Sequence, residues 1–358
     1  MDGKVGESGI KPKSLTYFLL ASLFTLTSYL SFVFVRGHFG GGDVFSSLGF
    51  LSAKAVAGLC VLLSVYFLFD TLRFFYVLKA LKIDIGIGYM LKLTFINIFI
   101  SNITPFATGG GFVQIYFLTK KNVPLGKAVA ASTIRTLLAT ILLFAAAPAA
   151  SAANLKLYEQ LNLSSSYVFW AVLIVFYGSI GLFVFLMFKN VRLVKYGFYR
   201  LLKFFERRKV ISRTRTIKTY RSFASELGGF KSSIRLFLKG DKLCIFLAAA
   251  YTVMFLLSLF MFPALLTGAM GYQIPLTNII KTQTIVTFLT YFAPTPGASG
   301  VAEVGFALLF SDMVTAGDVA ALTLSWRFFT IYIGVFLGFL VFYSSAFMPG
   351  RRTPKKER

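Results

Sequence analysis

The strongest constraint on this chain is a series of apolar segments long enough to cross a lipid bilayer. Inside a bilayer the backbone finds no water to bond, so only helices and closed barrels can span it. A helix needs about 20 apolar residues to cross about 30 Å of hydrocarbon. Six such segments predict full transmembrane helices, at about 15–35, 55–77, 128–147, 166–188, 243–262 and 319–342.

The composition supports this interpretation. Of the 358 residues, 57% are hydrophobic and 14% are charged, which is far too apolar for a water-exposed surface. The net charge of +24 lies mainly outside the apolar segments. It indicates contact with anionic lipid rather than nucleic acid, because no basic stretch matches a nucleic-acid-binding module. We expect an all-α, multi-pass protein of the plasma membrane.

Two further apolar segments are short and are interrupted by proline and glycine. The first contains Asn102-Ile-Thr-Pro-Phe-Ala-Thr-Gly-Gly-Gly-Phe-Val-Gln114, and the second contains Tyr291-Phe-Ala-Pro-Thr-Pro-Gly-Ala-Ser-Gly-Val-Ala-Glu303. Proline and glycine break a helix, and neither half of either segment can cross the bilayer alone. Each segment therefore predicts a re-entrant helical hairpin, over 89–118 and 279–310.

The two motifs share a spacing that predicts an internal duplication. They are aligned here on Pro105 and Pro294, and an arginine follows in the next apolar helix. The aligned pairs are Lys92 with Lys281, Gly111 with Gly300, Gln114 with Glu303, and Arg135 with Arg327. We expect one repeat over 49–150 and a second over 243–346.

A basic segment, 189–242, divides the two repeats. It holds sixteen basic and three acidic residues, with apolar residues between them. This pattern is typical of amphipathic helices that lie on an anionic leaflet.

The distribution of basic residues predicts the topology. If residues 1–14 are cytoplasmic, six spans and two hairpins place the segment 189–242 and the basic tail 347–358 on the same side. The weakly charged loops then lie outside. The hairpins would enter from opposite faces, which makes the halves inverted repeats. In transporters such repeats place broken helices at a substrate site near the bilayer midplane.

The two arginines within apolar spans need partners, because a charge at the bilayer centre costs between about 2.5 and 17 kcal/mol. In a structural interpretation, Arg327 pairs with Glu303, and Arg135 bonds to carbonyls freed by the break at Pro105. In a functional one, both arginines bind the phosphate of a lipid, which a bidentate guanidinium suits. Asp70 and Arg73 are expected to pair with each other near the headgroups.

Other residues of the motifs have alternative roles. Lys92 and Lys281 either snorkel to the interface or attract the substrate. Asn102 and Thr104 either cap broken helix ends, the preferred alternative, or bind the ligand. Glu303 is also a weaker candidate for a proton carrier. The glycines that would allow close backbone approach are Gly109, Gly110, Gly111, Gly297 and Gly300.

We expect neither a catalytic group nor a cofactor nor a metal site. The chain has a single histidine and few carboxylates, and the triple glycine is not followed by the Gly-Lys-Ser/Thr of a nucleotide loop.

The two motifs also resemble the flippase-like membrane region of lysylphosphatidylglycerol synthases and their stand-alone relatives. The first motif is followed by Leu125-Gly-Lys-Ala, and the second is similar to that family's Pro-Gly-Gly-x-Gly-x-x-Glu signature. The likeness covers about 15–345, and the family is associated with moving lysylated lipid across the membrane. No soluble aminoacyl-transfer domain follows, so aminoacylation is not expected. The resemblance points to Pro105, Gly110, Arg135, Pro296, Gly297, Gly300, Glu303 and Arg327.

Three functions follow as hypotheses. The first is a translocase for a phosphate-bearing lipid, such as an anionic or aminoacylated phospholipid, a polyprenyl-phosphate carrier or a glycolipid. The alternative is a non-transporting scaffold that uses 189–242 to recruit anionic lipid or a synthase. A lipid transferase with Glu303 as base has less support, because no second catalytic group is evident.

Overall fold

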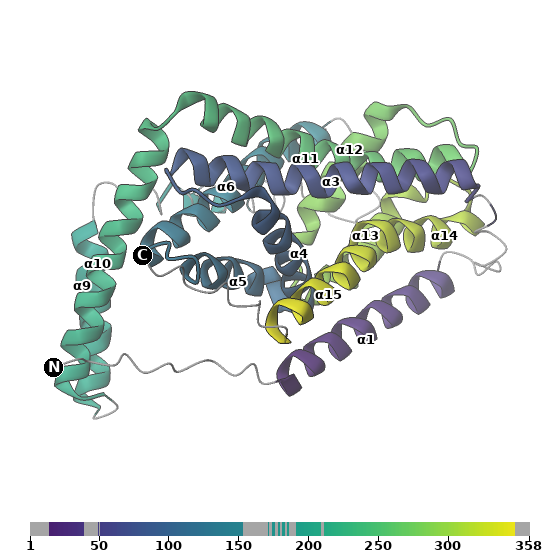
Figure 1. The fold of residues 1–358 in the computed structure, drawn as a ribbon. Helices are drawn as coiled ribbons and strands as arrows, with labels where there is room; N and C mark the ends of the chain where they lie inside the picture. The colour runs from purple at the N-terminus through teal and green to yellow at the C-terminus, as the bar shows by residue number, and fades with distance from the viewer. Residues whose placement is uncertain are drawn as a thin grey trace.

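A computed structural model describes residues 14–38, 49, 51–152, 191–208 and 211–347, with scattered positions between 171 and 185. Within these residues every regular element is a helix, which confirms the all-α prediction (Figure 1). The elements are α1 (Ser14–His38), α3 (Ala53–Ala80), α4 (Ile87–Ile103), η2 (Pro105–Ala107), α5 (Thr108–Thr119), α6 (Leu125–Ala152), α9 (Val191–Arg207), α10 (Arg213–Lys239), α11 (Lys242–Ala269), α12 (Leu276–Thr290), η3 (Pro296–Ala298), α13 (Val301–Phe310), α14 (Ala316–Arg327), η4 (Phe328–Tyr332) and α15 (Ile333–Phe347).

Among the described residues, four helices are long and apolar enough to cross a membrane. They are Ala53–Ala80, Leu125–Ser151, Lys242–Ala269 and the continuous run Ala316–Ser345. Helix α1 covers the predicted span 15–35, whereas most of 166–188 lies outside the described residues. The number of six spans and the re-entrant course of the hairpins stay predictions.

Both predicted helix breaks are present, and both are built in the same way. Each turn begins with proline, which is followed by two residues with positive φ. The φ values are 53° at Phe106 and Ala107 in the first turn, and 59° at Gly297 and 55° at Ala298 in the second. The second turn begins at Pro296. The alignment of Pro105 with Pro294 was therefore wrong by two residues, because five residues lie between α12 and its turn, whereas one lies between α4 and its turn.

The two halves exchange equivalent contacts. Helices α3 and α11 pack along one another (Figure 1). Turn η2 packs on turn η3. Helix α4 of the first half packs on α15 of the second, as α12 of the second packs on α6 of the first. This interchange is the pattern expected of two repeats related by a two-fold axis.

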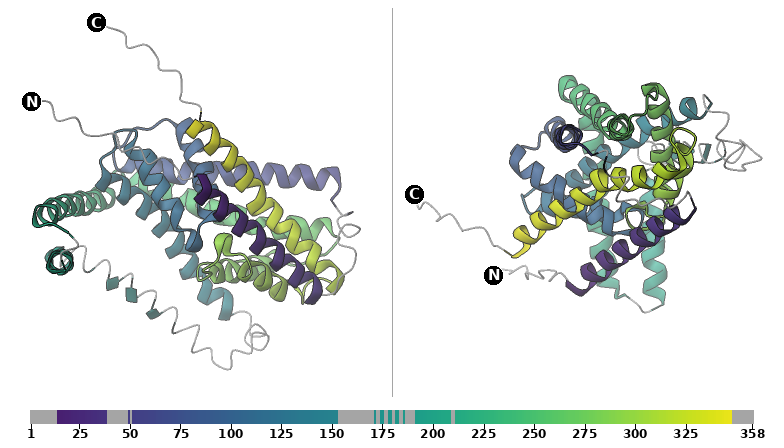
Figure 2. Two further views of the ribbon diagram at one scale, coloured as in Figure 1. Left: turned by 90° about the horizontal axis from the view of Figure 1, so that it is seen from below. Right: turned by 90° about the vertical axis from the view of Figure 1, so that its right-hand side faces the viewer.

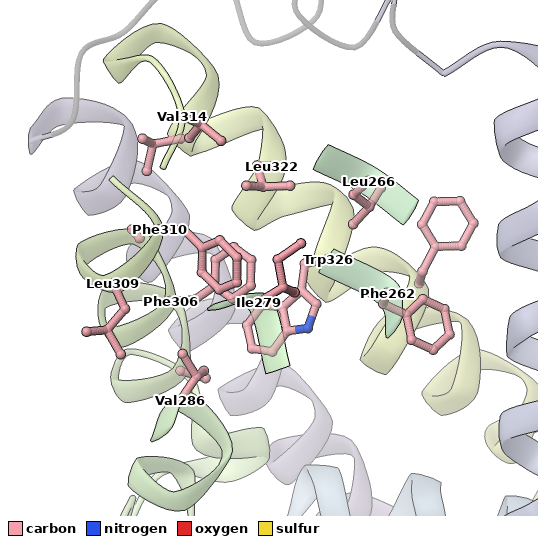
Figure 3. Close-up of a cluster of buried hydrophobic side chains, with 14 of the residues drawn as sticks. Phe262, Leu266, Ile279, Val286, Phe306, Leu309, Phe310, Val314, Leu322 and Trp326 are labelled. Atoms are coloured by element: carbon pink, nitrogen blue, oxygen red, sulfur yellow. The ribbon is translucent and has the colours of Figure 1, made fainter. Parts of the chain in front are cut away.

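Side chains from α11, α12, α13 and α14 form the largest apolar cluster (Figure 3). The ring of Phe306 stacks on Phe310 at 4.2 Å and on Trp326 at 4.3 Å between centroids. This packing fixes Trp326, and with it the backbone that carries the neighbouring Arg327.

The basic segment forms two helices, α9 and α10, which pack against each other at one end of the bundle (Figure 1). Phe198 and Phe223 stack between them at 3.8 Å. The pair lies crosswise to α3, and one of its helices is seen end-on when the bundle is viewed from below (Figure 2). Helix α10 packs on α6, where a Cβ at Gly126 would lie 2.8 Å from the Glu226 carbonyl oxygen. The predicted amphipathic helices are present, whereas their place on a leaflet stays a prediction.

The contact between α4 and α15 depends on a glycine. A Cβ at Gly338 would lie 2.3 Å from the carbonyl oxygen of Phe95 and 2.8 Å from Cβ of Phe99. We predict that Gly338→Ala separates the helices and lowers the free energy of unfolding by about 1–3 kcal/mol. Gly58→Ala is the control, because a Cβ there meets nothing within 4 Å. The measurement is the thermal unfolding midpoint in lipid nanodiscs, and equal midpoints for the two variants would contradict the prediction.

Candidate functional site

A cavity of about 550 Å³ lies between the two broken helices. Both turns contribute to its wall, through Ala107 of η2 and Gly297 of η3. Arg135 and Arg327 line it as well, although they come from different repeats. The structure thus brings both halves of the duplicated motif to one site.

Arg135 pairs with Asp70 of α3. Its Nη2 atom donates to both carboxylate oxygens of Asp70, at 2.7 and 2.9 Å. Arg73 shares the same carboxylate through Nε at 2.6 Å, and its guanidinium stacks 3.8 Å from the ring centroid of Phe255. The predicted bond from Arg135 to carbonyls at Pro105 was wrong, because α3 and α6 pack closely enough to offer a charged acceptor instead.

The expected pairing of Asp70 with Arg73 is confirmed, but its expected position is not. Asp70 is 2% exposed and Arg73 is 7% exposed, and Arg73 lines the cavity. The pair therefore belongs to the polar interior rather than to an exposed helix end.

Arg327 pairs with Glu303, as the structural interpretation predicted. Nε of Arg327 donates to Oε1 of Glu303 at 2.8 Å, and Nη2 donates to the carbonyl oxygen of Gly297 at 2.7 Å. The second oxygen of Glu303 accepts from the Gly300 N–H at 2.7 Å, at the start of α13. The carboxylate thus joins the arginine to the broken turn and the helix that follows it.

The cavity wall carries hydrogen-bond donors that have no acceptor among the described residues. They are Arg73 Nη1, Gln114 Nε2, Arg135 Nε, Gln283 Nε2 and Trp326 Nε1. Gln283 is fully buried, and its Oε1 atom also lacks a partner. A buried polar group without a partner costs about 1–3 kcal/mol. All six atoms are themselves covered by neighbouring atoms, so a ligand rich in acceptor oxygens would reach the five donors only after their side chains turn toward the cavity.

Four of the other predicted residues line this cavity: Asn102, Gly111, Gln114 and Gly297. Gln114 is held by Ser132, whose hydroxyl donates to Oε1 at 3.0 Å. The Asn102 amide donates to the carbonyl oxygen of Ile98, one turn earlier in α4, at 2.8 Å, so Asn102 lines the cavity without capping the helix end. Gln114 lies deeper in α5 than Glu303 lies in α13, so the two are not structural equivalents.

A second group of predicted residues builds the turns. Thr104 donates to the carbonyl oxygen of Ile100 at 2.8 Å and accepts from the Gly109 N–H at 3.0 Å, which confirms its capping role. A Cβ at Gly110 would lie 1.8 Å from Oγ of Ser101, so this glycine permits close packing of α5 on α4. Pro105, Pro296, Gly109 and Gly300 also belong to the turns or to the helix starts beside them.

Three predicted residues lie away from the cavity. Lys92 is exposed on α4, Lys281 is half-buried on α12, and Pro294 is exposed before its turn. None of them lines the cavity. Nor do the described residues contain a cluster of three or more side chains that could hold a metal ion.

Sequence reasoning missed four contributors to the site. Asp70 and Arg73 were interpreted as a local pair because of their spacing, and Gln283 and Trp326 were not considered. The available signal was a glutamine in a short apolar helix, two residues after Lys281.

The two buried ion clusters differ in charge, which gives a test of stability. Asp70→Asn leaves two guanidiniums side by side, whereas Glu303→Gln leaves one arginine that keeps the carbonyl of Gly297. Breaking a buried pair costs about 3–5 kcal/mol, and we predict a larger loss for Asp70→Asn than for Glu303→Gln. The thermal unfolding midpoint measures it, and a second change, Arg73→Gln, should restore part of the loss. Equal losses would mean that repulsion between Arg73 and Arg135 is negligible.

Two comparisons with known proteins agree with these observations. A UPF0104 membrane protein of Archaeoglobus fulgidus is similar to this chain, with 24% identity over 279 residues, which cover 74% of this chain and 81% of the relative. The family model described as the lysylphosphatidylglycerol synthase TM region matches residues 18–338. That match spans both broken helices, both arginines and the basic segment between the repeats, and this membrane protein belongs to the family of lysylphosphatidylglycerol synthase transmembrane regions.

Proposed function

We propose that the protein is a translocase that moves a phosphate-bearing lipid between the two leaflets of the plasma membrane. The observation that carries the proposal is the set of buried donors without a partner among the described residues, on side chains that line the cavity. A phosphate group offers acceptor oxygens to several donors at once, and guanidinium binds it in bidentate fashion.

The charge of the site supports a headgroup with a single negative charge. Three guanidiniums, of Arg73, Arg135 and Arg327, face two carboxylates, of Asp70 and Glu303. One positive charge is left, which a phosphodiester would neutralise. Both carboxylates are engaged by arginines, and no acidic residue lines the cavity in the described part of the chain. The site thus favours an anionic lipid over an aminoacylated one.

The proposed mechanism uses the two-fold arrangement of the repeats. The headgroup enters between the turns η2 and η3, where the arginines neutralise its phosphate. Rocking of one repeat against the other then exposes the cavity to the opposite leaflet, as in other transporters with broken helices. In the proposed orientation both termini and the helices α9 and α10 face the cytoplasm. The lipid undergoes no chemical change.

The first prediction concerns Gln283, because its replacement should weaken lipid binding without lowering the stability of the protein. Gln283→Leu removes an amide without a partner, so the protein should be as stable as before or more stable. We expect the same variant to lose bound phosphate lipid in native mass spectrometry and to slow lipid translocation in proteoliposomes by about tenfold, the factor that corresponds to about 1.4 kcal/mol.

Thr282→Val is the matched control. The Thr282 hydroxyl is also buried without a partner, but this residue does not line the cavity. The control should retain lipid and transport. Normal lipid retention and translocation in Gln283→Leu would contradict the proposed function.

The second prediction concerns headgroup charge. Phosphatidylglycerol should bind and move better than its lysylated form, because the two added ammonium groups find no free carboxylate among the residues lining the cavity. Competition between the two lipids, read by native mass spectrometry of the wild-type protein, measures the preference. A preference for the lysylated lipid would mean that the charge argument is wrong.

The alternative function, a membrane scaffold, is favoured by one observation. Helices α9 and α10 present a basic, amphipathic surface at one end of the bundle (Figure 1). A scaffold would depend on this surface and not on the cavity. Its activity should therefore survive Gln283→Leu, which the proposed translocase should not.

A further inference from the structure

A second, apolar groove of about 490 Å³ lies beside the cavity, between α1 and α15. Its floor is formed by Phe99 and Ile103 of α4, and its sides by residues such as Thr25 of α1 and Phe336 of α15. Helix α1 runs alongside α15 in each view (Figure 1, Figure 2). The volume is within the range of about 300–1,000 Å³ that holds small ligands in proteins.

The wall that separates the groove from the cavity is thin. Ile331 lines the cavity, and the next residue, Tyr332, lines the groove. These residues end the π-helical turn η4, which directly follows Arg327. Such turns occur frequently at functional sites. The Tyr332 hydroxyl also interacts with Arg327, so this wall touches the arginine that faces the cavity.

Helix α1 closes the same wall from the other side. The ring of Phe24 lies against Gly297, where a Cβ would be 2.6 Å from Cε2 of Phe24. Phe24 also makes an edge contact with Tyr332, at 6.1 Å between centroids. The hydroxyls of Ser28 and Ser299 are 3.0 Å apart. Through these contacts α1 holds the turn η3, which carries the Gly297 carbonyl bound by Arg327.

The chemistry of the two spaces is complementary. The cavity contains donors without acceptors, whereas the groove is lined mainly by aromatic and aliphatic side chains. The Thr25 hydroxyl of the groove donates to the carbonyl oxygen of Ala21 at 3.0 Å, so it leaves its methyl group as the available surface. A molecule with a phosphate at one end and hydrocarbon at the other matches both spaces.

We infer that the groove between α1 and α15 is a binding site for one acyl chain of the lipid whose phosphate occupies the cavity. The inference rests on the proposed function. The lipid approaches on the side of α1, and the rings of Phe24 and Tyr332 turn aside to open the wall between the two spaces. Its phosphate then reaches Arg327, while one chain lies along Phe99 and Phe336. The groove thus contributes affinity that depends on chain length, and the cavity contributes affinity that depends on the headgroup.

The test fills the groove without touching the cavity. Thr25→Trp places a large ring in the groove, whereas Leu26→Trp, the matched control, places the same ring on an exposed neighbour outside it. Each variant is incubated with dioleoyl and with dihexanoyl phosphatidylglycerol, which share a headgroup. Retention is then measured by native mass spectrometry.

We expect Thr25→Trp to weaken retention of the dioleoyl lipid by about tenfold or more. This factor corresponds to two methylene groups of the acyl chain that are no longer buried in the groove. The dihexanoyl lipid should bind as before, and Leu26→Trp should change neither lipid. Unchanged dioleoyl retention in Thr25→Trp would overturn the acyl-chain site while leaving the proposed function intact. Gln283→Leu run in parallel should weaken both lipids, and only its failure to do so would argue against the cavity itself.

Discussion

The interior of this protein is organised by the need to neutralise buried guanidinium groups. Arginine does not lose its proton in a protein, so burial leaves it no alternative to a partner. Asp70 and Glu303 supply carboxylates from different repeats; Asp70 joins α3 to α6, and Glu303 joins α13 to the next helix, α14. The paired charges keep α3 against α6 and α13 against α14. The broken helices, the turns between them and the cavity are all placed by these contacts.

The turns η2 and η3 add a second constraint, because a broken helix leaves backbone groups that must find partners within the protein. Thr104 bonds to backbone groups on both sides of the first break, and Glu303 and Arg327 bond to backbone groups of the second. The second break also has a threonine before its proline, because Thr295 precedes Pro296 as Thr104 precedes Pro105, and the Thr295 hydroxyl donates to the carbonyl oxygen of Ser299 at 2.6 Å. The two turns therefore share this threonine and proline, and they differ in the ion pair that supports the second turn.

Much of this arrangement could be predicted from local patterns. Lengths of apolar segments located the helices, proline and glycine located the breaks, and the cost of a buried charge predicted the pairing of Arg327 with Glu303. The partner of Arg135 could not be found in this way, because Asp70 is 65 residues distant and its role depends on how α3 packs against α6. The register of the second turn depends on the conformation of the loop before Pro296. The local signal of Gln283, a glutamine in a short apolar helix, does not show its role, which only the absence of partners in the three-dimensional structure reveals.

The single uncompensated positive charge of the cavity has a consequence for energy coupling. If an anionic headgroup cancels it in the proposed translocase, the loaded cavity has no net charge in the membrane field, whereas the empty cavity has one positive charge. Displacing one charge across 100 mV corresponds to about 2.3 kcal/mol. A membrane voltage that is negative inside would then act on the return of the empty site and hold it toward the cytoplasm. Direction could thus be imposed on an otherwise passive carrier without a coupled ion.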